Sequence, residues 1–194
     1  EQTLPLRAAQ LRSLIAVDDM VGRVMRTLRA KRETHRTLVT YLSDNGYFWE
    51  EHGLEAKGPP YLQGVRVPMI MRWTGHLPAG TTDGRRAANI DIAPTIMEAA
   101  GVATPERFPM DGRSLLQPWR RSVVLTEFQR GRVAVAPTWA SLRAGRYHYV
   151  EYYRQGRVTF REYYRLRRDP WELENLLHDG DPANDPDVAA LHRR

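Results

Sequence analysis

The sequence predicts an α/β fold in which part of a mixed sheet, flanked by helices, is followed by a small antiparallel four-stranded sheet and a C-terminal helix. Three observations support this prediction. An apolar periodicity of three and four residues over residues 6–32 is typical of a helix, and residues 37–42 and 65–73 are short apolar runs of strand length. From about residue 121 onward, short β-prone runs alternate with glycine-containing turns.

The first element is a long amphipathic helix over residues 6–32. Its apolar side chains recur at helical spacing, at Leu11, Leu14, Ile15, Val17, Val21, Val24, Met25 and Leu28. Asp18 and Asp19 lie within this helix, but neighbouring helical positions point about 100° apart. We therefore interpret these two carboxylates as part of a solvated face and not as a pair of metal ligands.

Residues 37–42 are predicted to form a buried strand, because this run is short, apolar and rich in β-branched side chains. Asp44 and Asn45 follow its carboxyl end, the place at which open α/β sheets bind ligands. Their oxygen atoms, with Gly46 allowing a sharp turn, suit a hard cation such as Ca²⁺ or Mg²⁺. Asp-Asn-Gly is also the composition of an ordinary turn, so the spacing alone leaves both interpretations open.

Two further polar side chains lie in the loop that follows. Lys57 can return to the same corner as a fixed positive charge for an oxyanion. His52 is a candidate general acid or substrate ligand, and it is equally well explained as a surface residue in a turn.

The next two elements are a strand in the second half of residues 65–73 and a helix over residues 89–100. Asn89 or Asp91 can cap this helix, and Gly101 is expected to end it.

The last part of the chain is predicted to be a sheet of hairpins. Its turns are Gly145-Arg146 and Gln155-Gly156, and its strands are Ser122–Phe128, Ala140–Leu142, Tyr147–Tyr153 and Val158–Tyr164. The many tyrosines suggest either a stacking platform for single-stranded nucleic acid or cross-strand packing pairs, and we favour packing. We place the domain boundary between residues 1–118 and 119–194.

Composition narrows the class of protein. The chain has 194 residues and a formal net charge of +6, with arginines scattered among acidic residues and no recognition motif for nucleic acid, so we expect no nucleic-acid partner. The absence of cysteine excludes disulfides, thiol nucleophiles and cysteine-ligated metals. No apolar run is long enough to span a bilayer, and the first residues do not resemble a signal peptide, so we expect no membrane partner. These observations do not assign the protein to a cellular compartment.

Several motifs, in the correct order, resemble the sulfatase family, a branch of the alkaline-phosphatase-like superfamily. They are YLSDNG, HGLEAK, GVRVPMIMRWTG, NIDIAPTIMEAAGV, MDGRSLLQP, AGRYHYV and EYYRLRRDPWELENL. The resemblance covers nearly the whole of this chain, but it matches only the C-terminal portion of a sulfatase sequence. It implies the C-terminal part of a sulfatase-type mixed sheet followed by the small antiparallel subdomain.

The resemblance also implies roles for three residues. Asp44 and Asn45 match the positions that bind the active-site calcium ion, and Lys57 matches the lysine that contacts the sulfate. The family's nucleophile is a formylglycine made from Cys or Ser in a Cys/Ser-x-Pro/Ala-x-Arg motif. There is no cysteine here, and that context is absent around Ser13, Ser43, Ser114, Ser122 and Ser141. We therefore expect the chain alone to be inactive and to bind Ca²⁺ weakly, since Ca²⁺ takes six to eight oxygen ligands.

Three functions agree with these motifs. The first is the C-terminal portion of a calcium-dependent sulfatase acting on a sulfate-ester small molecule or glycan. The second is a phosphomonoester or phosphonate hydrolase of the same superfamily, and the third is a non-catalytic module that binds polyanions. Half of a sheet leaves an edge and an apolar face uncovered, so we expect pairing with the missing N-terminal portion or self-association.

Overall fold

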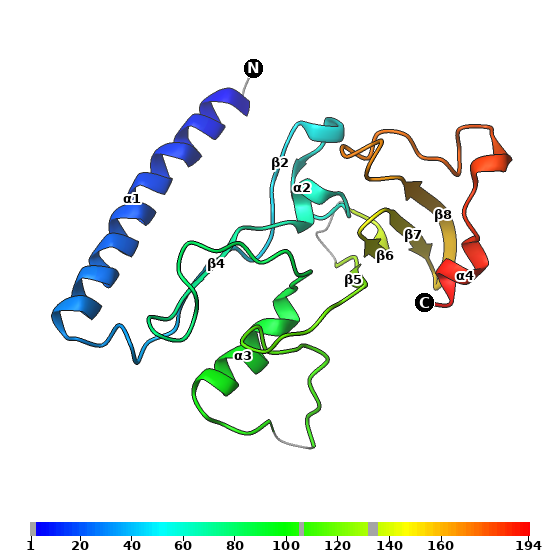
Figure 1. Ribbon diagram of the computed structural model, residues 1–194. Coiled ribbons are helices and arrows are strands. Elements are labelled where there is room, and N and C mark those ends of the chain that lie inside the picture. The colour runs from blue at the N-terminus through cyan, green and yellow to red at the C-terminus, as the bar shows by residue number, and fades with distance from the viewer. Residues whose placement is uncertain (1–2, 105–106, 132–135) are drawn as a thin grey trace.

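The computed structural model describes residues 3–104, 107–131 and 136–194. A long helix lies at one side of the molecule and a four-stranded antiparallel sheet at the other, with short strands and helices between them (Figure 1). Within the described residues, no helix has both the length and the apolar character needed to cross a membrane.

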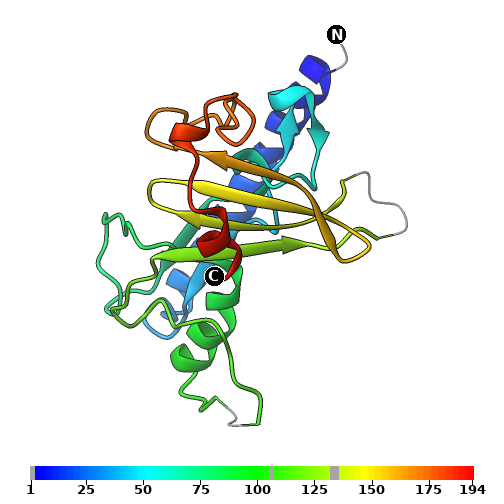
Figure 2. The same cartoon turned by 90° about the vertical axis from the view of Figure 1, so that its right-hand side faces the viewer.

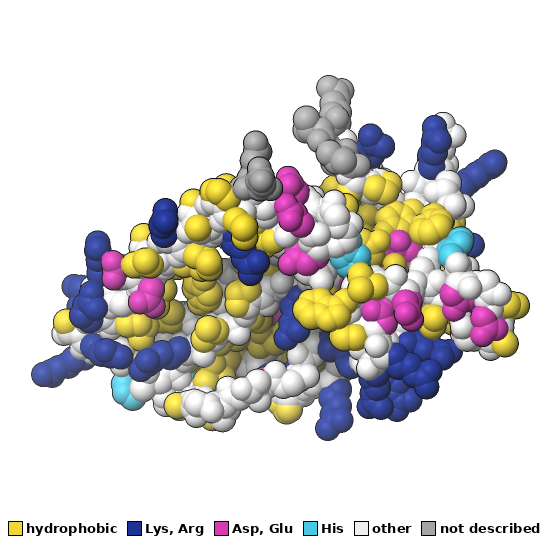
Figure 3. Space-filling model, turned by 90° about the horizontal axis from the view of Figure 1, so that it is seen from above, with side chains coloured by type: hydrophobic (Ala, Val, Ile, Leu, Met, Phe, Trp, Pro, Cys, Tyr) yellow, Lys and Arg dark blue, Asp and Glu magenta, His cyan; other side chains and the backbone are white. Residues whose placement is uncertain are grey.

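The long helix, α1 (Thr3–Ala30), confirms the predicted helix but has no buried side chain. Seven of its large apolar side chains are 45–75% exposed: Leu4, Leu6, Leu11, Leu14, Ile15, Met20 and Val24. Hydrophobic side chains accordingly reach the surface over the left half of Figure 3, where α1 lies. The helix therefore presents an apolar face that the described part of the chain does not cover.

The predicted strand at residues 37–42 is present, but the prediction that it is buried is wrong. The strand is β1 (Val39–Leu42), and Tyr41 and Leu42 are 36% and 38% exposed. Within the described residues β1 pairs only with the antiparallel β4 (Met69–Arg72), so both outer edges of this two-stranded sheet have no partner strand there.

The loop after β1 contains short elements that the sequence did not suggest. They are the paired strands β2 (Phe48–Trp49) and β3 (Glu55–Ala56), the 3-10 helix η1 (Glu51–Gly53) and the single-turn helix α2 (Leu62–Val65). Phe48 has no exposed surface and meets the ring of Tyr61 edge to face at 6.5 Å between centroids. This buried contact gives the loop a small core of its own.

The predicted helix at 89–100 is the 3-10 turn η2 (Asn89–Asp91) followed by α3 (Ile92–Ala99). Asp91 does not cap α3 with its side chain. Its buried carboxylate instead accepts hydrogen bonds from Ala88 N at 2.8 Å, Arg113 N at 2.8 Å and both terminal nitrogens of Arg121 at 2.7 Å. Asp91 thereby fixes the segment that leads into the C-terminal sheet.

The C-terminal sheet confirms the four predicted strands. Its order is β5-β6-β7-β8, and its strands are β5 (Val123–Phe128), β6 (Thr138–Ala144), β7 (His148–Arg154) and β8 (Arg157–Tyr164). Figure 2 shows these strands side by side, with the C-terminal helix against them. Gln155 and Gly156 both have positive φ, of 51° and 72°, as a tight hairpin turn requires. Tyr147 stacks on Tyr163 across the strands at 5.5 Å between centroids, so these rings pack on each other.

A buried carboxylate joins the last helix to this sheet. The chain ends in η3 (Pro182–Asn184) and α4 (Val188–His192). Glu151 of β7 accepts hydrogen bonds from the hydroxyls of Tyr149 and Tyr153, each at 2.6 Å, and from Arg161 at 3.0 Å, and its other contact is His192 Nδ1 of α4 at 2.8 Å. Burial raises the pKa of Glu151, but these partners outweigh it and hold the pKa at about 2.

Glu172 joins the loop after β1 to the C-terminal sheet. Its carboxylate is 1% exposed and accepts hydrogen bonds from Leu62 N and Arg143 Nη1, each at 2.9 Å. The buried His148 Nδ1 also lies 2.9 Å from Glu172 Oε1. Three segments that are distant in the sequence therefore meet on one side chain.

We expect Glu172→Ala to lower the free energy of unfolding by about 3–5 kcal/mol, because it leaves the buried His148 and the partly buried Arg143 guanidinium and Leu62 N–H without their partner. Urea unfolding followed by circular dichroism measures this loss. Glu174→Ala is the control, since this nearby glutamate is exposed and should change stability by less than about 0.5 kcal/mol. Equal effects of the two substitutions would contradict the structural role of Glu172.

Candidate functional site

The corner after β1 (residues 43–46) bends at Asp44 and is held by its own polar groups. Ser43 Oγ donates to Asn45 O at 2.9 Å, and Asn45 N donates to Asp44 Oδ1 at 2.9 Å. Gly46 N donates to Gly64 O at 3.0 Å, which fastens the corner to α2. The corner is therefore a bend at Asp44 that local hydrogen bonds hold, and it presents one oxygen from Asp44 and one from Asn45.

Lys57 returns to this corner, as the sequence suggested. Its Nζ donates to Asn45 Oδ1 at 3.0 Å and lies 3.9 Å from Asp44 Oδ2. The side chains of Lys57 and Asp44 are 61% and 81% exposed, so solvent screens this ion pair and it adds little to stability. The structure thus brings all three predicted residues together, with two oxygen atoms facing one cationic group.

The donor set fits a hard cation in kind but not in number. Carboxylate and amide oxygens are ligands that Ca²⁺ accepts, and Ca²⁺ takes six to eight oxygens. In the three described ranges of the chain, no group of three or more His, Cys, Asp or Glu side chains is placed to hold a metal ion. The described residues therefore offer part of a calcium site.

One hydrogen bond anchors the backbone next to Lys57, and three residues before Lys57 have positive φ. The carbonyl of Gly58, the next residue, accepts a hydrogen bond from the buried Trp139 Nε1 of β6 at 2.7 Å. Glu50, His52 and Ala56 have positive φ, of 82°, 57° and 67°, a conformation that costs residues with side chains about 1–2 kcal/mol each. Backbone strain of this kind persists only where the surrounding structure enforces it, and it gathers at functional sites.

Gly46 is needed here for close approach and not for positive φ. A Cβ atom at this position would lie 1.9 Å from the backbone oxygen of Gln63, and Gly46 is not among the glycines with positive φ. The bend at this corner therefore does not use a left-handed glycine. The residue lets α2 pack directly against the Asp44–Asn45 corner.

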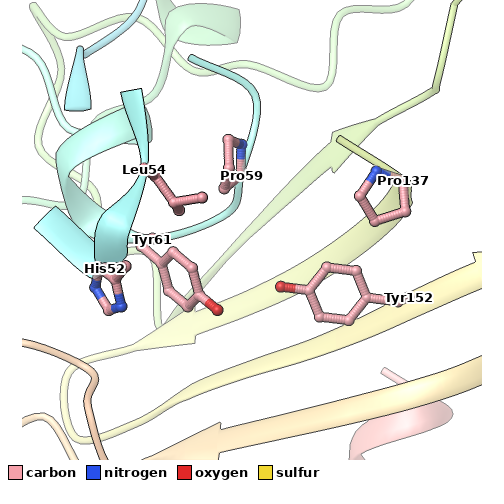
Figure 4. A pocket seen from close by; sticks show the side chains of 6 residues that line it. All are labelled: His52, Leu54, Pro59, Tyr61, Pro137 and Tyr152. Carbon is pink, nitrogen blue, oxygen red and sulfur yellow. The ribbon is translucent and has the colours of Figure 1, made fainter. Parts of the chain in front are cut away.

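His52 lies away from the contacts of Lys57 and lines a separate cavity of about 320 Å³. Its ring stacks on Tyr61, with centroids 4.0 Å apart and planes 6° apart. Figure 4 shows these two rings side by side, and shows the hydroxyls of Tyr61 and Tyr152 pointing toward one another. Each hydroxyl donates to the buried Glu162, at 2.9 Å and 3.0 Å.

Burial sets the ionisation of this cluster. Desolvation raises the pKa of Glu162, and it also raises the pKa of Tyr61 to about 12, with the charge of Glu162 adding to the effect. No local sequence pattern connects Tyr61 with Glu162, because Glu162 lies 101 residues further along the chain.

The comparisons with known proteins agree with this fold. The sulfatase family model matches residues 1–102, which is more than half of the chain. A solved protein in complex with its substrate, D-glucosamine-2-N,6-O-disulfate, has a TM-score of 0.77 and 26% identity over 86% of this chain and 35% of that chain. The phosphonate monoester hydrolase of Agrobacterium radiobacter has a TM-score of 0.74 and 27% identity over 86% of this chain and 36% of that chain.

Among curated proteins, the N-acetylglucosamine-6-O-sulfatase of Bacteroides thetaiotaomicron is 32% identical over 179 residues. That alignment covers 87% of this chain and 30% of the relative, so the chain spans less than a third of the relative's length. The described fold is of the mixed α/β class. The chain belongs to the sulfatase family.

We expect Gly46→Ala to destabilise the protein by about 1–3 kcal/mol, because the added methyl group overlaps the backbone oxygen of Gln63. Urea unfolding measures the change. Gly84→Ala is the control, since a Cβ at Gly84 would meet nothing within 4 Å and should shift stability by less than about 1 kcal/mol. If both alanines are tolerated equally, α2 is not held against the corner as described.

Proposed function

We propose that this chain is the C-terminal portion of a sulfuric ester hydrolase, in which Asp44 and Asn45 are calcium ligands and Lys57 contacts the sulfate. The observation that carries the proposal is the convergence of these three side chains at the end of β1, with Lys57 Nζ 3.0 Å from Asn45 Oδ1. Membership of the sulfatase family supports it, as does the similarity to a protein solved with a glucosamine disulfate.

The chemistry of the corner is electrostatic. A bound calcium ion would stabilise negative charge on the sulfate oxygens. Lys57 adds a fixed positive charge beside the same oxygens, where it acts on the charge that develops as the ester bond breaks. The Asp44 carboxylate and the Asn45 amide orient Lys57 through the contacts described above.

The substrate we propose is a sulfate ester of a small molecule or glycan. The relatives that carry this inference are named for a sulfated glucosamine substrate and for N-acetylglucosamine 6-sulfate. The similarity to a phosphonate monoester hydrolase favours a second candidate, hydrolysis of a phosphate or phosphonate monoester, because a lysine beside two oxygen ligands accepts either tetrahedral anion.

The partner we propose for the apolar face of α1 is the remainder of a longer polypeptide. Seven exposed apolar side chains along one helix, together with the uncovered β1–β4 sheet, need a covering layer. The relative's greater length supplies one, since this chain spans 30% of it.

In the complete protein that contains this chain, we expect Lys57→Met to lower kcat/KM for 4-nitrophenyl sulfate by about 10²–10³-fold, the usual loss for one group that stabilises transition-state charge. Lys31→Met is the matched control, because Lys31 is exposed just beyond α1 and should leave kcat/KM unchanged. Equal activity of the two variants would contradict the role of Lys57. Faster turnover of a phosphonate monoester than of the sulfate would favour the second candidate.

We expect the chain of residues 1–194 by itself to release no 4-nitrophenol from 4-nitrophenyl sulfate, because no serine in it has the context of the formylglycine motif. A colorimetric assay with and without added Ca²⁺ tests this, with the complete protein as the positive control. Turnover by the chain alone would show that another nucleophile acts. Tight binding of sulfated glycans by the chain, with no turnover by the complete protein, would favour the binding-module function.

A further inference from the structure

A second, smaller hollow lies against the loop that carries Lys57. It has a volume of about 190 Å³ and is lined by Glu51, His52, Gln63, Trp171 and Leu173. His52 lines both this hollow and the larger cavity beside Tyr61. None of the roles proposed for Asp44, Asn45 and Lys57 uses this hollow.

Two polar atoms in its lining lack partners. Nε2 of His52 and Oε1 of Gln63 are buried and make no hydrogen bond within the described part of the chain. Buried polar atoms without a partner are rare in native proteins and call for an explanation such as a missing water or ligand. The imidazole nitrogen donates or accepts according to its tautomer, and the amide oxygen accepts, so a ligand with hydroxyl groups satisfies both.

An exposed indole forms one side of the hollow. Trp171 is 63% exposed and Leu173 is 69% exposed, while Glu172 between them is buried and has a φ of 60°. The three contacts of the Glu172 carboxylate turn that side chain inward and hold its two neighbours at the surface. Trp171 is therefore a large aromatic surface on an anchored backbone, which loses little conformational freedom on binding.

The hollow adjoins the proposed sulfate site. The backbone of Gln63 packs against Gly46, the residue after Asn45, and Gly46 N donates to Gly64 O at 3.0 Å. The corner and the hollow differ in charge. Lys57 attracts an anion to the corner, whereas the Glu51 carboxylate in the lining of the hollow repels one. The hollow thus suits a neutral, hydroxyl-bearing part of the same substrate.

We propose that this hollow is a sugar-binding subsite, in which the C–H face of a pyranose ring stacks on Trp171 and ring hydroxyls pair with His52 Nε2 and Gln63 Oε1. The negative face of the indole attracts the partly positive C–H groups of a sugar ring. Ligand pockets combine an aromatic surface with a few placed polar groups in this way. The proposal rests on the proposed function, since it assigns the sugar of a sulfated glycan to the site beside Lys57.

The test compares two substrates in the complete protein that contains this chain. Trp171→Ala is expected to raise KM about 10-fold for a disaccharide containing glucosamine 6-sulfate, and Gln63→Ala to raise it several-fold. Both variants should keep kcat/KM for 4-nitrophenyl sulfate within about twofold, because that substrate has no sugar to stack. Phe108→Ala is the control, since Phe108 is an aromatic side chain 60% exposed that does not line the hollow.

Equal losses on both substrates, or no loss on the disaccharide, would overturn the subsite. Trp171→Phe keeps an aromatic face and should retain most of the affinity, which separates stacking from a folding defect.

Calorimetric titration of the unsubstituted protein with the desulfated disaccharide gives a readout independent of turnover. Binding that Trp171→Ala abolishes supports the subsite even if neither sulfate is hydrolysed, an outcome that would overturn the proposed function alone. Absence of binding overturns the subsite.

Discussion

The carboxylate of Glu172 is the contact on which the arrangement of the molecule depends. It accepts hydrogen bonds from Leu62 N in α2 and from Arg143 in β6, and lies 2.9 Å from His148 Nδ1 in β7. Burial raises the pKa of Glu172, but the contact with His148 and the hydrogen bond from Leu62 lower it further than burial raises it. A charged group kept at 1% exposure is stable only while every partner stays in place, so α2 and the C-terminal sheet are held in one relative position.

Two series of hydrogen bonds connect this arrangement to the candidate site. The first runs from Leu62 through α2 to Gly64, whose carbonyl holds Gly46 and with it the Asp44–Asn45 corner. The second runs from β6 through Trp139, whose indole holds Gly58 next to Lys57. The corner and the lysine are therefore fixed from opposite ends by the same sheet, although their own contact is exposed and weak. Rigid support of this kind is what an electrostatic site needs, since its effect depends on charges already in place.

Local features of the fold could be predicted from the sequence, and contacts between distant segments could not. Periodicity predicted α1 and the four strands of the C-terminal sheet, and the pair Gln155-Gly156 predicted a turn whose φ values the structure confirms. The short elements between β1 and β4 carry no periodicity, and the role of Gly46 depends on Gln63 arriving from α2. The pairing of Tyr61 with Glu162, and the inward turn of Glu172, need the folded chain. The calcium and sulfate roles of Asp44, Asn45 and Lys57, and the domain boundary after residue 118, stay predictions.

The uncovered surfaces and the incomplete ligand set have one physical explanation in common. Within the described residues, nothing covers the seven exposed apolar side chains of α1 or the outer edges of the β1–β4 sheet, and the corner offers two oxygens where Ca²⁺ takes six to eight. In an α/β fold both needs are met at the same place, because strands added parallel to β1 pair with its open edge and end beside Asp44 and Asn45, while further helices cover the faces of the sheet. The C-terminal sheet, by contrast, has its own buried cluster of Leu142, Tyr149 and Leu191 and keeps its polar network paired around Glu151. Within the described residues, the polar network of the C-terminal sheet is therefore paired, whereas β1, which leads into the candidate corner, keeps an unpaired edge.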